Sequence, residues 1–464
     1  MIYISERLYR RITLKDFSYS YHIQKIYITS HKSFNMLDIK FIIENAHLVK
    51  ENLKKRFKSD QIWLVDELVE DHSRWKELKK AADDLRHKRN TISLEISNLK
   101  KQKKDASRLL KEAADIPGRI KELEEDIRIL DEEILKKLYQ IPNMLHSSVP
   151  TGKDALQNPE LKKVGKPKKF NFPLLSHVEI AEKLKIADFD AGREAAGQGF
   201  NYLLSELAQL DLALQRYGID FLLKRKFTPV IPPIMLNKET LSGAVDLSAF
   251  EEVVYKVENE NLFLIGTAEH ALVSMMKNKT FEKSELPLKF CAVTPCFRKE
   301  IGAHGVDTKG LFRMHQFNKV EQVVFATKDN SFKLLEELQG ITEEFFKSLE
   351  IPFRVIEICS GDLGGKFAKQ YDIEAWFPRQ NEYKEVTSAA NCTDYQARRL
   401  NIRYADKGNR EHVHILNNTM VATSRAMVAI LENFQRKDGS IKIPDVLHAY
   451  LGFKEIAPKK GAKS

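Results

Sequence analysis

Arginine and acidic side chains recur at strand-like spacing in residues 289–326, where two strand-like runs flank a polar loop, 301–310, that holds three glycines. Arg298 and Glu300 are two residues apart in the first run, so both would point to one face of a strand. Four side chains would share one face of the second run: Arg313, His315, Phe317 and Glu321. Arginine binds phosphate through a fixed fork of donors, and a phenylalanine ring can stack on a base. The pattern predicts a hairpin that presents one face to a polar, partly flat ligand; a hairpin with a solvated face is the alternative.

The chain after residue 176 alternates short apolar runs with helical stretches. The strand-like runs are 263–268, 288–298, 353–360, 371–377 and 412–418, and the helical stretches lie near 331–349 and 425–436. Strands of this length that are separated by longer helices are typical of an α+β domain. We therefore predict an α+β fold with a mainly antiparallel sheet, and the hairpin described above belongs to that sheet.

A heptad pattern precedes this domain. Apolar residues recur in steps of three and four over residues 64–99, and a second stripe runs over 116–138. Two such seams predict an antiparallel coiled-coil hairpin, with a break at the Pro117–Gly118 pair. A helix over 64–99 would be about 50 Å long, too long to bury against a compact domain, so it should project. The lysine cluster in 100–104 favours a nucleic-acid partner, and a structural or dimerising coiled coil is the alternative.

These patterns divide the chain into four segments. Residues 1–35 are rich in Tyr, Ser and basic residues, whereas Met36 begins a segment typical of a protein start. We expect 1–35 to be a dispensable leader, a transit peptide or a start-site artefact. Residues 36–145 would form a domain that carries the helical hairpin, the proline-rich stretch 146–175 a linker, and residues 176–464 the α+β domain.

The composition is that of a soluble globular protein. Hydrophobic residues make up 43% and charged residues 30% of the chain, and a net charge of +10 favours a polyanionic partner. No apolar run approaches the ~18 residues of a membrane span, so we expect no membrane partner. The four cysteines lack the spacing of a zinc site or a disulfide framework, which predicts a reducing compartment.

The hairpin and several other stretches resemble one enzyme family. Arg298-Lys299-Glu300, the loop and residues 313–317 are similar to motif 2 of class II aminoacyl-tRNA synthetases, and the continuation NKVEQ narrows the resemblance to seryl-tRNA synthetases. FTPVIPPIML, with Pro233, resembles motif 1, and NNTMVATSRAMVAILENFQ, with Arg425, resembles motif 3. Thr267-Ala268-Glu269, CSGDLG, YDIEAWFP and NEYKEVTSAANCTDYQARR also match the family's pattern, and the helical hairpin is similar to its tRNA-binding arm.

This resemblance implies that the protein activates L-serine with ATP to seryl-adenylate. Serine would then pass to tRNA(Ser), and also to selenocysteine tRNA where the cell contains one. The family resemblance further implies a homodimer formed through motif 1, a cytoplasmic location, and Mg²⁺ as the ion that accompanies ATP.

The resemblance also assigns roles to individual residues. Arg298 and Arg425 would be the catalytic residues, holding the α- and γ-phosphates of ATP while charge builds in the transition state. The expected ATP-binding set is Arg298, Lys299, Glu300, Met314, Phe317, Glu385, Val386, Thr387, Ser388 and Arg425. Glu385 and Ser388 would also place oxygens on Mg²⁺. The expected serine-binding set is Thr267, Ala268, Glu269, Arg298, Glu321 and Thr419.

The sequence departs from the commonest bacterial pattern of this family. NNTMVATSR replaces a glycine-rich run and TSAAN replaces an SSCSN-like run, but both keep a hydroxyl, at Thr419 and at Ser388. These differences resemble the archaeal and eukaryotic style of the enzyme.

Three other classes of protein share some of these features but differ from this sequence in others. A ligase that loads an amino acid onto a carrier protein would lack the helical hairpin. A catalytically dead adaptor would have lost one of the residues Arg298, Glu300, Glu385 and Arg425. Threonyl, prolyl, glycyl and histidyl synthetases normally carry a C-terminal anticodon-binding domain, for which the 39 residues after Arg425 are too few.

Overall fold

The computed structural model of the chain describes residues 38–245, 253–300 and 310–458. The predicted leader, residues 1–35, and most of the motif 2 loop, residues 301–309, lie outside the described residues. Among the helices of the described ranges, none combines the length and the apolar character that crossing a membrane requires.

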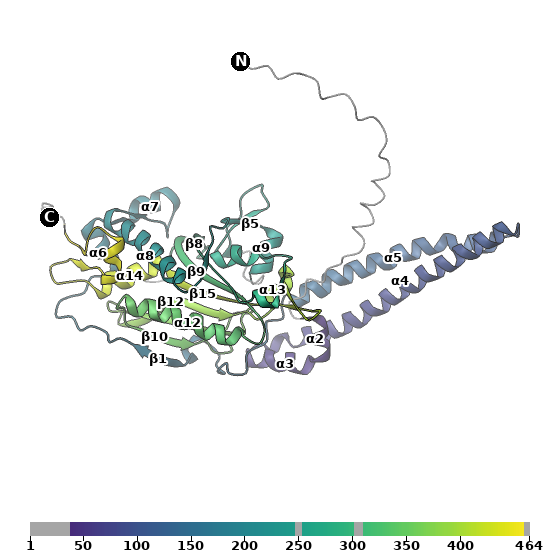
Figure 1. The fold of residues 1–464 in the computed structure, drawn as a ribbon, viewed down its shortest axis with the longest axis horizontal. Coiled ribbons are helices and arrows are strands. Elements are labelled where there is room, and N and C mark those ends of the chain that lie inside the picture. The colour runs from purple at the N-terminus through teal and green to yellow at the C-terminus, as the bar shows by residue number, and fades with distance from the viewer. Residues whose placement is uncertain (1–37, 246–252, 301–309, 459–464) are drawn as a thin grey trace, which may run out of the picture. The chain divides into compact units, whose positions relative to one another are not determined.

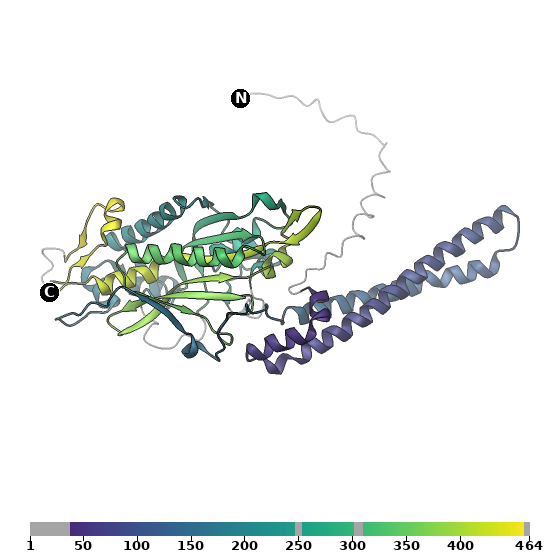
Figure 2. The ribbon, with the colours of Figure 1, turned by 60° about the horizontal axis from the view of Figure 1, so that its bottom comes forward.

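The N-terminal part is helical. Two short helices, α2 (Ile39–Glu44) and α3 (Ala46–Lys55), precede two long ones, α4 (Trp63–Lys101) and α5 (Ser107–Leu138). Figures 1 and 2 show α4 and α5 side by side as an antiparallel hairpin, which confirms the predicted helical pair. Two separate apolar clusters hold the hairpin together, because a long helix pair can bury only the seam between its members. The cluster at the base includes Leu68, Leu130 and Ile134, and the cluster further out includes Ile92, Ile116 and Ile120.

The predicted break at Pro117–Gly118 is wrong. α5 runs through Pro117 without ending, and the turn between the helices is residues 102–106. Proline removes one backbone donor from a helix. Its ring is exposed here, while the neighbours Ile116 and Ile120 are buried against Ile92, so the seam keeps the helix continuous across this position.

An eight-stranded sheet forms the centre of the second part. Its strand order is β1 (Glu160–Val164), β10 (Phe353–Glu357), β11 (Lys369–Phe377), β12 (Glu382–Asn391), β15 (His414–Ala422), β9 (Gln316–Ala326), β8 (Leu288–Phe297) and β4 (Thr228–Pro229). Every neighbouring pair is antiparallel except β4 and β8. The predicted α+β fold with a mainly antiparallel sheet is therefore confirmed.

Two helical layers cover different parts of this sheet. Three helices bury their apolar residues against one face: α8 (Ser205–Leu223), α12 (Ser331–Ser348) and α14 (Thr423–Asn433); α6 (His177–Leu184) packs on α14 and joins the same apolar cluster. On the other face, α11 (Ala268–Ser274) and α13 (Tyr395–Leu400) share a smaller cluster with Val323 and Phe325 of β9. Along β9, Val320 and Val324 belong to the larger cluster, so alternate residues of one strand serve both faces.

Shorter elements complete this part. They are η1 (Ser59–Gln61), η2 (Ala155–Gln157), β2 (Ala187–Asp188), α7 (Phe189–Ala196), β3 (Tyr202–Leu203), β5 (Met235–Asn237), α9 (Lys238–Ala244), β6 (Leu262–Leu264), β7 (Thr280–Glu282), η4 (Lys283–Glu285), β13 (Arg403–Asp406), β14 (Asn409–His412), β16 (Ile441–Lys442), η6 (Asp445–Tyr450) and β17 (Glu455–Ile456). The stretch 146–175, expected to be a linker, contributes β1 to the edge of the sheet, where it pairs with β10.

Hydrogen bonds from two residues join the helical part to the sheet. Arg56, which follows α3, is buried, and its guanidinium donates to the carbonyl oxygens of Leu363 at 3.0 Å and Phe367 at 2.6 Å. The same guanidinium donates to the carbonyl oxygen of Asn143 at 2.9 Å, and the Asn143 side chain donates to the carbonyl oxygen of Lys366 at 3.0 Å. The loop between β10 and β11 is thus held from outside the sheet.

We expect Arg56→Ala to lower the free energy of unfolding by about 3 kcal/mol, because several buried carbonyl oxygens lose a charged donor. Urea or thermal unfolding measures the change. Arg74→Ala, on the exposed side of α4, is the matched control and should stay within about 0.5 kcal/mol of the parent protein. Equal stability of the two variants would contradict a stabilising role for Arg56.

Candidate active site

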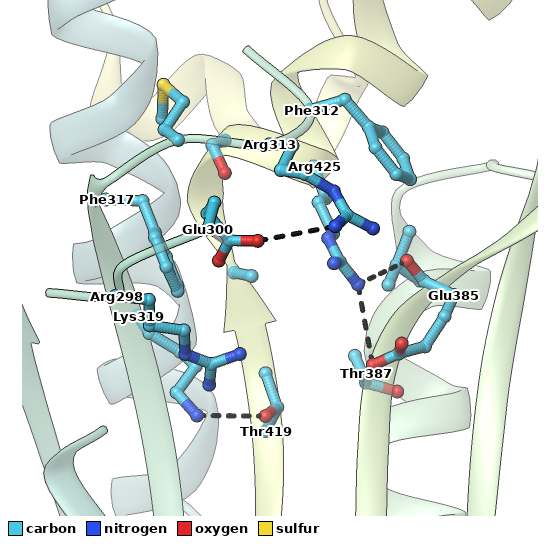
Figure 3. Close-up of a pocket in the computed structure, with 14 residues that line it drawn as sticks. Arg298, Glu300, Phe312, Arg313, Phe317, Lys319, Glu385, Thr387, Thr419 and Arg425 are labelled. Atoms are coloured by element: carbon cyan, nitrogen blue, oxygen red, sulfur yellow. Dashed lines mark hydrogen bonds and ion pairs between the residues drawn. The ribbon is translucent and has the colours of Figure 1, made fainter. Parts of the chain in front are cut away.

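A pocket opens on the sheet face that α11 and α13 leave uncovered, between β9, β12, β15 and the start of α14. Figure 3 shows the side chains that line it. They are Arg298, Glu300, Phe312, Arg313, Met314, Phe317, Lys319, Glu385, Val386, Thr387, Thr419, Ala422, Ser424 and Arg425. The pocket thus contains several of the residues predicted from the sequence, together with four that were not.

The hairpin of β8 and β9 provides one wall. The Arg298 guanidinium lies 5.4 Å from the centre of the Phe317 ring, and its Nε donates to the carbonyl oxygen of Gly266 at 3.1 Å. Arg313 lies 3.5 Å from the carboxylate of Glu300. The predicted grouping of arginines, carboxylate and aromatic ring at this end of the hairpin is therefore present.

His315 does not line the pocket, contrary to the expectation from strand periodicity. β9 begins at Gln316, so the alternation of a strand does not extend back to this histidine. Its Nδ1 lies 2.7 Å from the Tyr255 hydroxyl and 2.9 Å from the carbonyl oxygen of Arg298, and its ring stacks on Phe200. His315 fixes the end of the hairpin instead of facing a ligand.

Arg425 and β12 provide the opposite wall. Arg425 lies in the first turn of α14, and its guanidinium donates to the carbonyl oxygen of Glu385 at 2.8 Å. The Glu385 carboxylate is 3.4 Å from the same guanidinium, and the Phe312 ring centre is 5.0 Å away. Arg298 and Arg425 therefore lie on different walls of one pocket, as Figure 3 shows.

A β-bulge decides which β12 side chains share a face. Glu374 of β11 pairs with Glu385, but the next residue, Ile373, pairs with Thr387, so Val386 is the extra residue. Asp372 is opposite Ser388 and forms a hydrogen bond with it. Glu385 and Ser388 are three residues apart, and the bulge brings them to one face.

Asp372 adds a second carboxyl beside Glu385 and Ser388. Burial raises the pKa of Asp372 well above its usual value, and the negative charge of Glu385 raises it further. A cation would offset this repulsion, and oxygen donors are what Mg²⁺ prefers. The described residues contain no group of three or more His, Cys, Asp or Glu arranged to hold a metal ion.

A buried polar cluster adjoins the pocket at Lys319 and Thr419. The Lys319 ammonium lies 2.5 Å from a carboxylate oxygen of Glu321, and the hydroxyls of Thr267 and Thr419 donate to the same oxygen at 3.3 and 3.4 Å. Burial raises the pKa of Glu321, and the charge of Lys319 acts against this rise. Glu321 and Thr419 are direct partners across β9 and β15.

Glu269 is a second buried carboxylate near this cluster. Its Oε1 accepts from the Lys366 ammonium at 2.6 Å and from the Gln396 amide at 2.7 Å. Burial alone would raise the pKa of Glu269, but the positive charge of Lys366 and the hydrogen bonds from Lys366 and Gln396 lower it below its usual value. Burial lowers the pKa of the adjacent His270 to about 3. Glu269 is consequently held as an anion.

Three more of the predicted residues, Thr267, Ala268 and Lys299, do not line the pocket. Thr267 caps the N-terminus of α11, and Ala268 is buried in the first turn of that helix. Lys299 uses its backbone N–H to donate to the carbonyl oxygen of Val253, and its side chain does not line the pocket.

Sequence reasoning missed five polar residues: Lys319, Lys366, Gln396, Asp372 and Ser424. Lys319 could have been found, because it lies midway between Phe317 and Glu321 and so shares their strand face. Lys366 and Gln396 come from a loop and from α13, and no local spacing links them to Glu269.

The arrangement has two compartments with different chemistry. Arginines on two walls and aromatic rings suit a phosphate-bearing nucleotide. The adjoining cluster presents buried carboxylates and hydroxyls, which suit a small ammonium compound that carries a hydroxyl group.

Two family models match the chain. The seryl-tRNA synthetase N-terminal domain matches residues 36–145, and the class II tRNA synthetase core domain (G, H, P, S and T) matches residues 255–434. A serine–tRNA ligase of Methanospirillum hungatei is 48% identical over 424 residues, which are 91% of this chain and 100% of that protein. One from Pyrococcus horikoshii is 45% identical over 445 residues, covering 91% of this chain and 98% of that protein.

Solved structures agree with these relatives. The seryl-tRNA synthetase from Pyrococcus horikoshii complexed with ATP superimposes with a TM-score of 0.86 at 44% identity and covers 91% of this chain and 100% of that one. The cytoplasmic serine–tRNA ligase from Naegleria fowleri in complex with AMP superimposes with a TM-score of 0.82 at 35% identity, covering 91% and 99% of the two chains. The chain therefore belongs to the seryl-tRNA synthetase family, the ligases that attach serine to tRNA.

Proposed function

We propose that this pocket forms seryl-adenylate from L-serine and ATP in the cytoplasm, and that the hairpin of α4 and α5 binds tRNA(Ser). The observation that carries the proposal is that the two compartments are continuous. Lys319 and Thr419 line the pocket, both contact the Glu321 carboxylate, and the Lys319 ammonium donates to the Thr419 hydroxyl. A ligand that spans both would bring an amino acid carboxylate next to the α-phosphate. Transfer to selenocysteine tRNA, where present, would use the same adenylate.

The nucleotide would lie along the larger compartment. Phe317 would stack on adenine, Glu300 would accept from the adenine amino group, and the backbone near Met314 would line the ring. Arg298 would hold the α-phosphate and Arg425 the γ-phosphate, so positive charge would flank the phosphorus under attack. No protein nucleophile is needed, since alignment and charge stabilisation suffice for this step.

Mg²⁺ would be held by Glu385 and Ser388, with Asp372 beside them, and would neutralise phosphate charge when bound. Glu385, Ser388 and Asp372 would orient the phosphates from one wall, while Val386 and Thr387 close the side of the compartment next to Arg425.

Serine would occupy the smaller compartment, bound by Glu321, Glu269, Thr267, Thr419 and the backbone near Ala268. The two carboxylates and their two lysines carry no net charge, so the zwitterionic amino acid enters without leaving an uncompensated buried charge. The carboxylate of serine would then face Arg298.

We also propose a homodimer. The motif 1 segment and α8 expose large apolar side chains, among them Ile231, Leu212, Met235 and Leu223. Apolar residues that gather on one surface are typical of a protein interface, and a two-fold axis would pair the same surface of each copy.

The domain boundaries follow from these roles. Residues 36–145 would form the tRNA-binding domain and 176–464 the catalytic domain, joined by 146–175. Residues 1–35 would be dispensable for both reactions. Support for the tRNA role comes from the lysines in 100–104, which lie at the end of α4 and in the turn that follows it.

Replacing Arg298 with alanine should slow serine-dependent exchange of pyrophosphate into ATP about a hundredfold, since about 3 kcal/mol of transition-state stabilisation is lost. Arg436→Ala, an exposed arginine near the C-terminus of α14, is the matched control and should exchange normally. Exchange within twofold of the parent enzyme by a folded Arg298→Ala variant would overturn the assignment.

Glu321→Gln keeps the shape of the side chain and removes its charge. We expect the KM for serine in the exchange reaction to rise at least tenfold, about 1.4 kcal/mol, while the KM for ATP changes less than twofold. Glu337→Gln, on the exposed side of α12, serves as the control. An unchanged KM for serine, or a change confined to ATP, would remove Glu321 from the serine site.

Truncation of the hairpin separates the two half-reactions. Replacing residues 86–120 with a short Gly-Ser linker removes the outer cluster and the lysines but keeps Leu68, Leu130 and Ile134 at the base. Serine activation should stay within twofold, whereas tRNA charging should fall at least tenfold.

Substitution of Lys100, Lys101, Lys103 and Lys104 with glutamine is the milder companion to this truncation. It should weaken tRNA binding and reduce the slope of log affinity against log salt by up to about 3. Normal tRNA charging by the truncated enzyme would show that the hairpin is only a structural element.

A further inference from the structure

We propose that Lys366 is a positioning residue for serine recognition, and that the N-terminal domain sets the affinity for serine by holding the loop that carries it. The inference rests on the proposed serine site and adds a determinant of serine affinity that lies outside that site. It connects the domain that would bind tRNA with the carboxylate that would bind the substrate ammonium.

The first step is the contact between Lys366 and Glu269. The two side chains are 12% and 6% exposed, and the Lys366 ammonium lies 2.6 Å from Oε1 of Glu269. The Gln396 amide donates to the same oxygen, and its nitrogen also donates to the carbonyl oxygen of Ala244. Both contacts fall on Oε1, so neither uses Oε2. These contacts hold the carboxylate by Oε1, and we assign Oε2 to the substrate ammonium.

The second step is electrostatic. Glu269 and Glu321 are both buried; burial raises the pKa of Glu321, and the negative charge of Glu269 raises it further. The cationic groups around them are Lys366, Lys319 and Arg298, and the neutral imidazole of His270 is adjacent. Without Lys366, burial would favour the protonated form of Glu269. A protonated Glu269 would no longer attract the ammonium of serine.

The third step is the anchoring of the loop. Residues 363–367 lie in the loop between β10 and β11, and two residues of the N-terminal domain bind their backbone. Arg56 donates to the carbonyl oxygens of Leu363 and Phe367, and the backbone N–H of Asn143 donates to the carbonyl oxygen of Gly365 at 2.8 Å. The Asn143 amide donates to the carbonyl oxygen of Lys366 itself. A change in the docking of the N-terminal domain therefore changes the position of the Lys366 ammonium.

The test uses the full-length enzyme and serine-dependent exchange of pyrophosphate. Lys366→Met should raise the KM for serine about tenfold while kcat and the KM for ATP change less than twofold, and Lys366→Arg should restore most of the affinity. In Lys366→Met, the acid limb of the profile of kcat/KM for serine against pH should move up by about 1–3 pH units, because Glu269 would then protonate more readily. Lys369→Met, which removes another buried lysine beside a carboxylate, Glu357, is the matched control and should leave the KM for serine unchanged.

The domain link has its own variant. Asn143→Ala should raise the KM for serine about threefold in the parent enzyme and have no further effect in the Lys366→Met background. If Asn143→Ala does not fold, Arg56→Lys, which cannot reach both carbonyl groups, replaces it. Additive effects of the two substitutions, or an unchanged KM for serine in Lys366→Met, would overturn the inference.

A parallel loss of kcat, ATP affinity and thermal stability in Lys366→Met would also overturn it, because that result means a purely structural role. Glu321→Gln, measured in the same assay, distinguishes the two failures. If Glu321→Gln impairs serine binding and Lys366→Met does not, the serine site stands and only the inference about Lys366 fails.

Discussion

The buried ion pair between Lys319 and Glu321 is the interaction on which the site depends. The two residues alternate on β9, so their side chains point to one face and lie 2.5 Å apart. Removing one member of such a pair leaves a buried charge, at a cost of about 3–5 kcal/mol. The sheet must therefore hold β9 and β15 in fixed register, since the Thr419 hydroxyl also donates to Glu321. The helices on the opposite face supply that rigidity through the apolar side chains of the same strands.

Departures from ideal strand geometry aim the polar side chains. The bulge at Val386 brings Glu385 and Ser388 to one face, and a second irregularity follows Thr419, where β15 shifts its register against β9. Bulges re-aim side chains at the cost of local pairing, and here the residues at the two irregularities, Val386 and Met420, are buried in the apolar cluster while their neighbours face the pocket. The walls of the pocket are thus set by backbone irregularities as much as by residue identity.

The sequence was most informative where periodicity and function coincide. The strands around Phe317, the α+β pattern and the helical hairpin all follow from apolar spacing. Arg298 and Glu300 reach the pocket as expected, although β8 ends at Phe297 and strand alternation does not extend to them. Long-range relations did not follow from spacing. Asp372 and Lys366 reach the site through pairing and loop contacts between segments far apart in the chain. Pro117 shows the limit of local rules, because a buried seam outweighs one missing hydrogen bond.

The joint between the two domains relies on main-chain acceptors. Arg56 and Asn143 bind carbonyl oxygens of residues 363–367, and every residue type offers a carbonyl oxygen. Hydrogen bonds of this kind fix the backbone of the loop and allow most of its side chains to vary. The joint is not built from main-chain acceptors alone, because Asp38 lies 3.5 Å from the Arg398 guanidinium and the Tyr139 ring lies 5.1 Å from that of Arg399. An N-terminal domain from another chain would need to supply these partners as well as the arginine and the asparagine.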